Sequence, residues 1–125
     1  MAQIKYNLGT IGGMTVTELW SGSVGNLAGI VNNVKITLND DFTNYKFLVF
    51  DFNRGFNGGS RYYSRVISVQ QFTNLFNNTD TIACINFNWG YGSDTDYFDI
   101  YQDSTTRVLN IGSNSTQCTR IVGIN

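Results

Sequence analysis

The chain has 125 residues, enough for one domain with a core of its own. Its 8 basic and 9 acidic residues exclude the clustered positive surface that nucleic-acid backbones require, and its lack of histidine excludes imidazole metal sites and Ser-His or Cys-His nucleophiles. The 33 Val, Ile and Thr residues and 18 aromatic residues outnumber 26 strong helix formers, and 51 residues are Asn, Gly, Ser or Thr, so the composition predicts an all-β protein with tight turns.

Residues 1–13 form the first predicted unit, an N-terminal arm. They show no sustained apolar period and end in Gly12-Gly13, a pair typical of a flexible connection. They lack an apolar block of about 7 residues, so no cleavable secretion signal is predicted. Apolar stretches such as residues 47–50 are far shorter than the roughly 18 residues of a membrane span. We expect a docking or flexible arm before one domain, residues 14–125, and no membrane insertion.

Alternating side chains predict the first strands of the domain. Residues 14–20 (MTVTELW) alternate well enough for a strand, and the small residues of 21–29 are typical of a loop. Val34, Ile36 and Leu38 alternate with polar residues, which indicates a strand with one face in water. A turn is predicted at residues 39–41 (NDD).

Residues 44–53 (NYKFLVFDFN) form the most apolar predicted strand. Both of its faces are apolar, with Tyr45, Phe47 and Val49 on one and Leu48, Phe50 and Phe52 on the other. This strand is therefore central, or one of its faces meets another subunit. A glycine-rich hairpin connection at residues 53–60 leads into a strand at 61–69. Residues 70–76 predict one turn of helix.

The rest of the chain predicts four more strands, at residues 81–89, 96–102, 106–111 and 119–124, with a loop at 90–95. About eight strands at this spacing, without alternating helices, predict an antiparallel β-sandwich of the jelly-roll type. The apolar segments 45–52 and 120–124 offer more hydrophobic surface than one small sandwich must bury. We therefore expect the protein to form a homo-oligomer.

The densest set of carboxylates is Asp94, Asp96, Asp99 and Asp103. A calcium loop needs several converging oxygen ligands, and the third acid and the glycine of an EF-hand are missing here. A glycosidase pair needs two carboxyl groups about 5 to 9.5 Å apart across a cleft. Solvated loop acids are the plainer interpretation, so neither a metal site nor a catalytic residue is predicted. Cys84 and Cys118 lie in apolar, strand-like contexts, which favours two buried free thiols over one disulfide.

Two glycine-rich connections combine aromatic and polar side chains in a way that suits sugar recognition. An aromatic ring covers the apolar C–H face of a sugar, while polar groups hold its hydroxyls and glycine lets the loop approach closely. Aromatic residues in a β-rich domain are more often part of the core, but at least one of the two loops is predicted to be a contact surface. The candidate receptor-loop residues are Arg54, Phe56, Arg61, Tyr62, Trp89, Tyr91, Asp94 and Asp96.

Four strings occur in order from residue 17 onward: TELWSGS (17–23), ITLNDDFTNYKFLVF (36–50), SRVISV (64–69) and TRIVGIN (119–125). This ordered set resembles the small β-rich modules of bacteriophage tail-fibre, receptor-binding and head-fibre proteins. The resemblance implies a virion surface protein, frequently trimeric, whose outer loops meet a host-cell polysaccharide or another receptor. Such modules usually close a much longer fibre, whereas here only a short arm precedes the module. We therefore expect the arm, Met1 to Gly13, to dock on other virion proteins of a capsid or tail.

The expected function is that of a non-enzymatic virion structural protein, assembled in the host cytoplasm, with a homotrimer implied by the resemblance. Its expected partners are further copies of itself, other virion proteins and a host-surface glycan, with no cofactor and no nucleic acid. The alternative is a monomeric carbohydrate-binding module of a secreted protein, in which Trp89 and Tyr91 contact the sugar. A small glycosidase that uses Asp94, Asp96 or Asp99 is the third hypothesis.

Overall fold

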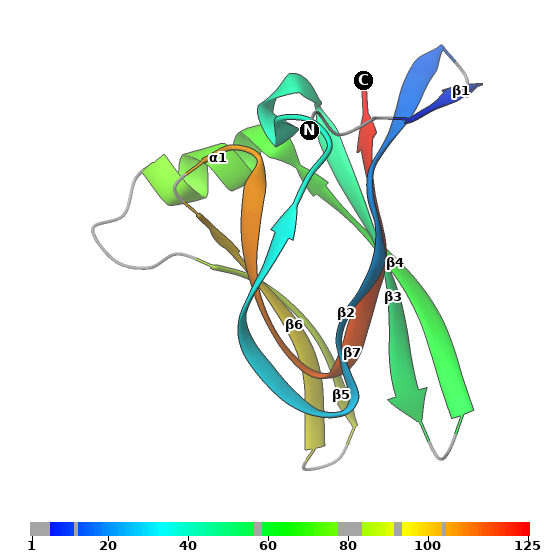
Figure 1. Ribbon diagram of the computed structural model, residues 1–125, viewed down its shortest axis with the longest axis vertical. Helices are drawn as coiled ribbons and strands as arrows, with labels where there is room; N and C mark the ends of the chain where they lie inside the picture. Colours follow the sequence, from blue (N-terminus) through cyan, green and yellow to red (C-terminus); the bar gives the residue numbers. More distant parts are fainter. Residues whose placement is uncertain (1–5, 12, 57–58, 78–83, 92–93, 104) are drawn as a thin grey trace.

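The computed structural model describes residues 6–11, 13–56, 59–77, 84–91, 94–103 and 105–125 (Figure 1). Its elements are β1 (Tyr6–Ile11), β2 (Met14–Thr37), η1 (Phe42–Asn44), β3 (Phe47–Phe56), β4 (Gly59–Ser68), α1 (Val69–Asn77), β5 (Cys84–Tyr91), β6 (Asp94–Gln102) and β7 (Val108–Ile124). The predicted all-β class with antiparallel pairing is confirmed. The seven strands form one hydrogen-bonded sheet, so a sandwich of two separate sheets is not confirmed.

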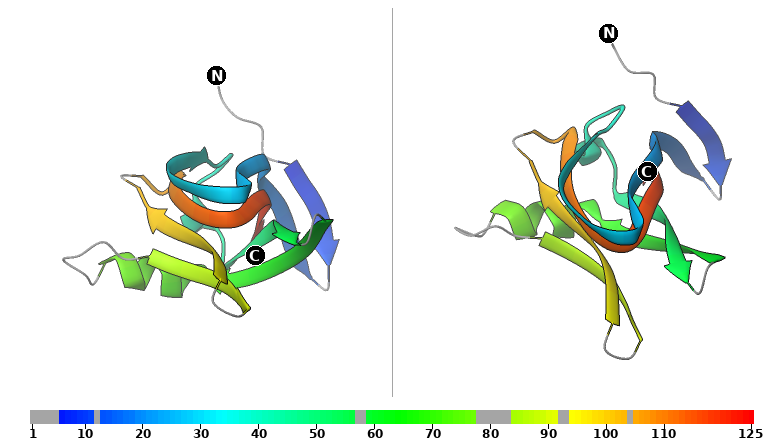
Figure 2. Two further views of the ribbon diagram at one scale, coloured as in Figure 1. Left: turned by 90° about the horizontal axis from the view of Figure 1, so that it is seen from below. Right: turned by 60° about the horizontal axis from the view of Figure 1, so that its bottom comes forward.

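β7 is the centre of the sheet. The strand order is β1-β2-β7-β3-β4, and β6 pairs with both β5 and β7. β2 follows one edge of β7 along nearly its whole length. On the other edge, residues 109–114 pair with β6 and residues 116–124 pair with β3. The sheet therefore branches at β7, and its two branches, β3–β4 and β5–β6, curve around one interior (Figure 2).

Two of the predicted connections are strands instead. The loop predicted at residues 21–29 is part of β2, and the strands predicted at 106–111 and 119–124 are one continuous strand, β7. The residues involved pair with each other across the sheet, for example Val24 with Cys118. Their Gly, Ser and Asn content is typical of turns, but the hydrogen bonds to a distant partner strand decide their conformation.

The β2–β7 ribbon bends sharply, and irregular residues produce the bend. Its register shifts at four places, and Gly25, Asn33 and Ser115 have positive φ values of 118°, 57° and 54°. The bend returns the end of β2 to its own beginning, where the Asn39 N–H donates to the Leu19 carbonyl oxygen at 2.7 Å. The ribbon therefore closes over the interior, as Figure 1 shows.

Part of the predicted N-terminal arm belongs to the sheet. Residues 6–11 form β1, which pairs with β2 through a turn in which Gly13 has a φ of +83°. Residues 1–5 and 12, also assigned to the arm, lie outside the described residues.

The core lies between the two branches of the sheet. Leu48, Phe50 and Phe52 of β3 are at most 1% exposed, which confirms the predicted alternation for these residues. Tyr45, predicted on the opposite face, precedes β3 and is buried in the same core. Phe52 contacts Phe98 of β6, with ring centroids 4.8 Å apart, so both branches share one core. Cys118 of β7 is a buried free thiol, and burial raises its pKa to about 12. The Cys84 side chain lies outside the described part of the structure.

The α-helix α1 covers one end of this core. It has nine residues, more than the single predicted turn. Its Phe72 is fully buried and meets Phe42 of η1 edge to face, with ring centroids 5.0 Å apart. This aromatic pair fixes α1 against the turn that follows β2.

Candidate functional site

The two predicted receptor loops are the tips of the β3–β4 and β5–β6 hairpins. Both hairpins point to the same end of the molecule, away from α1 (Figure 1). We call this region the hairpin end. The predicted receptor residues whose side chains the structure describes there are Arg54, Arg61, Tyr62 and Asp96. Residues 57–58 and 92–93 of the tips lie outside the described residues.

An ion pair between Arg54 and Asp96 joins the two hairpins. The two side chains are only 11% and 15% exposed. Burial alone would lower the pKa of Arg54, but its hydrogen bonds to Asp96 and Tyr63 raise it above the ordinary value. The structure therefore brings together one predicted residue from each loop, and both are engaged with each other rather than free for a ligand.

The other predicted receptor residues divide into two groups. Arg61 and Tyr62 are exposed, Tyr62 to 77%, on the outer edge strand β4. The side chains of Phe56, Trp89, Tyr91 and Asp94 lie outside the described part of the structure. Only their backbone positions are given, for example by the pairing of Trp89 with Asp96 and of Tyr91 with Asp94. That these four side chains contact a ligand therefore stays a prediction.

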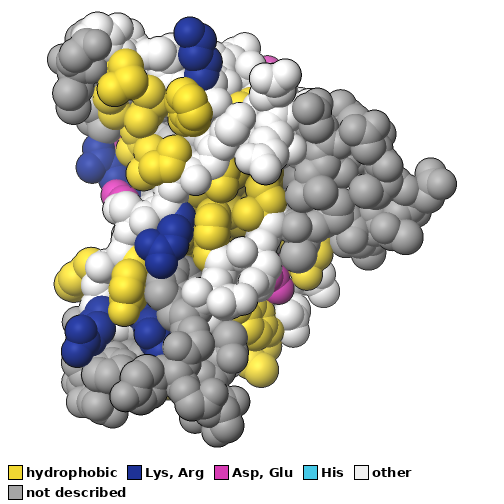
Figure 3. All heavy atoms as spheres, turned by 180° about the vertical axis from the view of Figure 1, so that it is seen from behind, with side chains coloured by type: hydrophobic (Ala, Val, Ile, Leu, Met, Phe, Trp, Pro, Cys, Tyr) yellow, Lys and Arg dark blue, Asp and Glu magenta, His cyan; other side chains and the backbone are white. Residues whose placement is uncertain are grey.

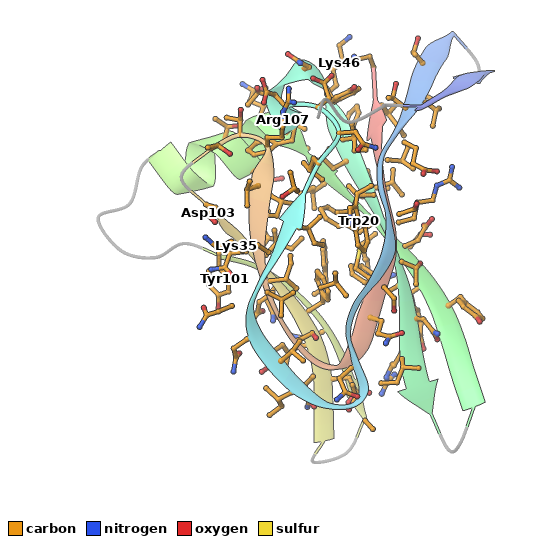
Figure 4. All side chains as sticks on the ribbon, viewed as in Figure 1. Trp20, Lys35, Lys46, Tyr101, Asp103 and Arg107 are labelled. Carbon is orange, nitrogen blue, oxygen red and sulfur yellow. The ribbon has the colours of Figure 1, made fainter. Side chains whose placement is uncertain are left out.

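The described members of the acidic set, Asp96, Asp99 and Asp103, each contact a different residue and do not converge on one point. Asp96 pairs with Arg54, Asp99 accepts a hydrogen bond from the Asn86 side-chain amide at 2.5 Å, and Asp103 pairs with Lys35 at 2.8 Å. Figure 4 shows the last pair on the side of the molecule where β2 and β6 lie. Among the described residues, no group of three or more His, Cys, Asp or Glu side chains is placed to hold a metal ion.

A second surface, which sequence analysis recognised only in part, covers the side of β2, β7, β3 and β4 that points away from the core. Paired residues in antiparallel strands share a face, so the register places three rows on it. We call these rows the outer face. They consist of Val16, Ile124, Phe47 and Ser68; Glu18, Val122, Val49 and Val66; and Arg120, Asp51 and Ser64.

The first two rows of the outer face are mainly apolar, and several of their side chains reach solvent. Phe47 is 42% and Val66 61% exposed, whereas Val122 of the second row is only 8% exposed. The third row is polar, and its groups are paired: Arg120 lies 3.2 Å from the Glu18 carboxylate of the second row, and the Ser64 hydroxyl donates to Asp51 at 2.6 Å. In the view from behind, hydrophobic patches alternate with Lys and Arg side chains (Figure 3).

An open hollow of about 600 Å³ lies at the end opposite the hairpin end, between η1, the start of β3 and α1. Its lining residues are Thr43, Tyr45, Lys46, Phe47, Ser68, Val69, Gln70 and Thr73. Sequence analysis missed this hollow because its polar residues are spread over three elements and form no motif.

Tyr45 lines the hollow, and both its hydroxyl and its ring contact neighbouring residues. Its hydroxyl donates to Asp40 at 2.9 Å, and Asp40 also accepts a hydrogen bond from the Asn44 amide at 3.1 Å. Its ring lies over Gly123, where a Cβ atom would be 2.5 Å away. Burial, together with the hydrogen bond to Asp40, raises the pKa of Tyr45 to about 12. The phenol therefore stays protonated at neutral pH.

The comparisons with known proteins add no relative. The chain matches no protein-family model, and a search of curated proteins found no significant match. Among the described residues, no helix is both long and apolar enough to cross a membrane. The resemblance to bacteriophage modules therefore stays a prediction from the ordered strings alone.

Proposed function

We propose that this chain is a non-enzymatic structural module of a bacteriophage particle surface, which self-associates through its outer face and presents its hairpin end to a host receptor. The exposed apolar half of the outer face is the observation that carries the proposal. Phe47 and Val66 are 42% and 61% exposed, although the opposite side of their strands fills the core. Covering such side chains contributes about 25 cal/mol per Å² of buried apolar surface.

A second copy of this chain is the partner that the charges favour. Arg120 of the polar row lies between Asp51 of the same row and Glu18 of the second row, so opposite charges alternate across this part of the outer face. Such a face has little net charge and meets an identical face without strong repulsion. Two identical patches that meet face to face close a two-fold dimer, whereas a ring of three needs two different parts of the face to meet. The trimer is the form that the resemblance implies.

The hairpin end has the chemistry of a receptor contact. Tyr62 is 77% exposed beside the exposed Arg61, and aromatic and guanidinium groups are common at recognition surfaces. The Arg54–Asp96 pair holds the two hairpins together, which reduces the ordering cost of binding. A host-surface glycan is the proposed ligand class, and docking on other virion proteins is the proposed role of residues 1–13.

The described carboxylates support a non-enzymatic role over a glycosidase. Asp96 and Asp99 are each engaged by a different neighbour, Arg54 and Asn86. A glycosidase would need two such groups arranged across one substrate.

A mass-spectrometric inventory of purified phage particles, taken from a culture that produces this protein, tests the placement on a virion. We expect its peptides in the particle fraction at a constant ratio to the major capsid protein, with the particle-free lysate as control. Peptides found in the lysate and absent from the particles would overturn the placement.

A further inference from the structure

We propose that the hollow beside α1 binds an acidic saccharide, a pyranose ring that carries a carboxylate. The site lies at the end of the molecule opposite the hairpin end, where Figure 4 places Lys46. It does not depend on the virion role, but it shares Phe47 and Ser68 with the outer face, so it requires that self-association leave the hollow open.

The hollow has the size and the apolar surface that a sugar ring needs. Its volume of about 600 Å³ lies within the roughly 300–1,000 Å³ of small-molecule sites. Of its apolar lining residues, Tyr45 and Val69 are 7% and 6% exposed, and Phe47 is 42% exposed. The Phe47 ring therefore offers most of the apolar surface that would cover the C–H face of a pyranose.

Polar side chains from three elements surround this apolar surface. The hydroxyls of Thr43, Ser68 and Thr73 both donate and accept hydrogen bonds, and the Gln70 amide offers one acceptor and two donors. Such a mixture matches the hydroxyl groups around a sugar ring. An apolar ligand such as a fatty acid would leave these groups without partners, which costs free energy.

Lys46 gives the hollow its preference for a carboxylate. Its side chain is exposed at the lining, and no described residue forms an ion pair with its ammonium group. Other basic residues are already paired, namely Lys35 with Asp103, Arg54 with Asp96, Arg107 with Asp41 and Arg120 with Glu18. A hydrogen bond from an ammonium group to a carboxylate is stronger than one between neutral groups.

The backbone around Lys46 is fixed before any ligand arrives. Its N–H donates to the Ile124 carbonyl oxygen at 2.9 Å, and its carbonyl oxygen accepts from the Val69 N–H at 2.9 Å. The lining residue Tyr45 is fixed by the hydrogen bond from its hydroxyl to Asp40. A site on such a rigid frame loses little conformational entropy on binding.

The test is an NMR titration of amide signals with the methyl glycosides of glucuronic and galacturonic acid, and with those of glucose and galactose. At least one acid is expected to shift the signals of Lys46, Phe47 and Gln70, and to bind more tightly than its neutral counterpart. Lys46→Met should weaken binding of that acid about tenfold or more. Thr73→Val should weaken the acid and the neutral sugar alike.

Lys35→Met is the matched control, because it removes a lysine that lies outside the hollow. It should leave the affinity unchanged. The proposal is overturned if neither acid shifts these signals at millimolar concentration, if neutral and acidic sugars bind equally, or if Lys46→Met binds as the unaltered protein does. Thermal unfolding of each variant verifies that the fold is kept, since Lys46 is exposed.

Discussion

The bend of the β2–β7 ribbon depends on single residues with a positive φ. At Gly25, φ is +118°, and a Cβ atom would lie 2.1 Å from the Thr116 carbonyl oxygen. Glycine takes this conformation without strain and leaves room for the neighbouring strand. The residue type at position 25 thus allows the two strands to stay paired through the bend.

We expect Gly25→Ala to lower the free energy of unfolding by about 2–4 kcal/mol, because it combines backbone strain with a clash against the paired strand. Gly29→Ala is the matched control, since the nearest atom to its Cβ would be the Asn26 side-chain nitrogen at 3.5 Å. That change should stay within about 1 kcal/mol. Urea denaturation of both variants gives the comparison, and equal losses would contradict the role of Gly25.

Two buried acidic groups make the stability fall at alkaline pH. The pKa of Tyr45 is raised from 10.0 to about 12 and that of Cys118 from 9.0 to about 12, in both cases chiefly by burial. The unfolded chain releases these protons at the lower values, whereas the folded chain keeps them up to about 12. Their stabilising contribution is therefore complete below pH 9 and is lost as the pH rises to about 12.

Tyr45→Phe tests this linkage. The variant lacks the hydrogen bond to Asp40, so its free energy of unfolding should be about 1 kcal/mol lower at neutral pH. Between pH 10 and 12 its stability should fall less steeply than that of the unaltered protein. The difference between the two curves should reach on the order of 2 kcal/mol. The free energy of unfolding, measured at several pH values, decides the question. Parallel curves over this range would show that Tyr45 does not keep its proton in the folded state.

At the scale of elements, the pair Arg54–Asp96 links the two branches of the sheet. Both side chains are at most 15% exposed, so removal of one partner leaves a charge with little access to water. We expect Arg54→Met and Asp96→Asn each to cost about 2–4 kcal/mol, and the double variant to cost little more than either.

The pair Lys35–Asp103, in which the lysine is exposed, provides the control for that experiment. The Lys35 side chain is 62% exposed, so Lys35→Met should change the stability by less than about 1 kcal/mol. Denaturant unfolding of the two single variants, the double variant and the Lys35→Met control gives the free energies of unfolding for this double-mutant cycle. Additive losses for Arg54 and Asp96 would mean that the two residues stabilise the protein independently.

The elements with nearby partners could be predicted from the sequence. The β3–β4 hairpin joins strands that are adjacent in the chain, and the alternation of Leu48, Phe50 and Phe52 marks its buried side directly. The helix at residues 69–77 has its own apolar period. In these segments the local pattern and the final structure agree because one face of each element meets the core.

The bent ribbon and the sites could not be predicted in the same way. Gly25 pairs with Gln117, far along the chain, so turn-forming residues there stand in a strand. The meeting of Arg54 with Asp96 and the rows of the outer face also depend on strand order, which local periodicity does not contain. The apolar segments 45–52 and 120–124 indicated part of the outer face in advance.

At the scale of the whole molecule, the apolar half of the outer face is the feature that calls for a partner. Val66→Lys places a charge in it at a side chain that is 61% exposed, so the fold should be kept while association is lost. Thr37→Lys adds the same charge at an exposed position of β2 outside the outer face and should leave association unchanged.

The most direct test of self-association is the mass of the unaltered protein, measured by light scattering across micromolar concentrations. Our account predicts at least twice the 14.0 kDa chain mass, three copies being the number that the resemblance implies. A mass of 14.0 kDa at every concentration would contradict it.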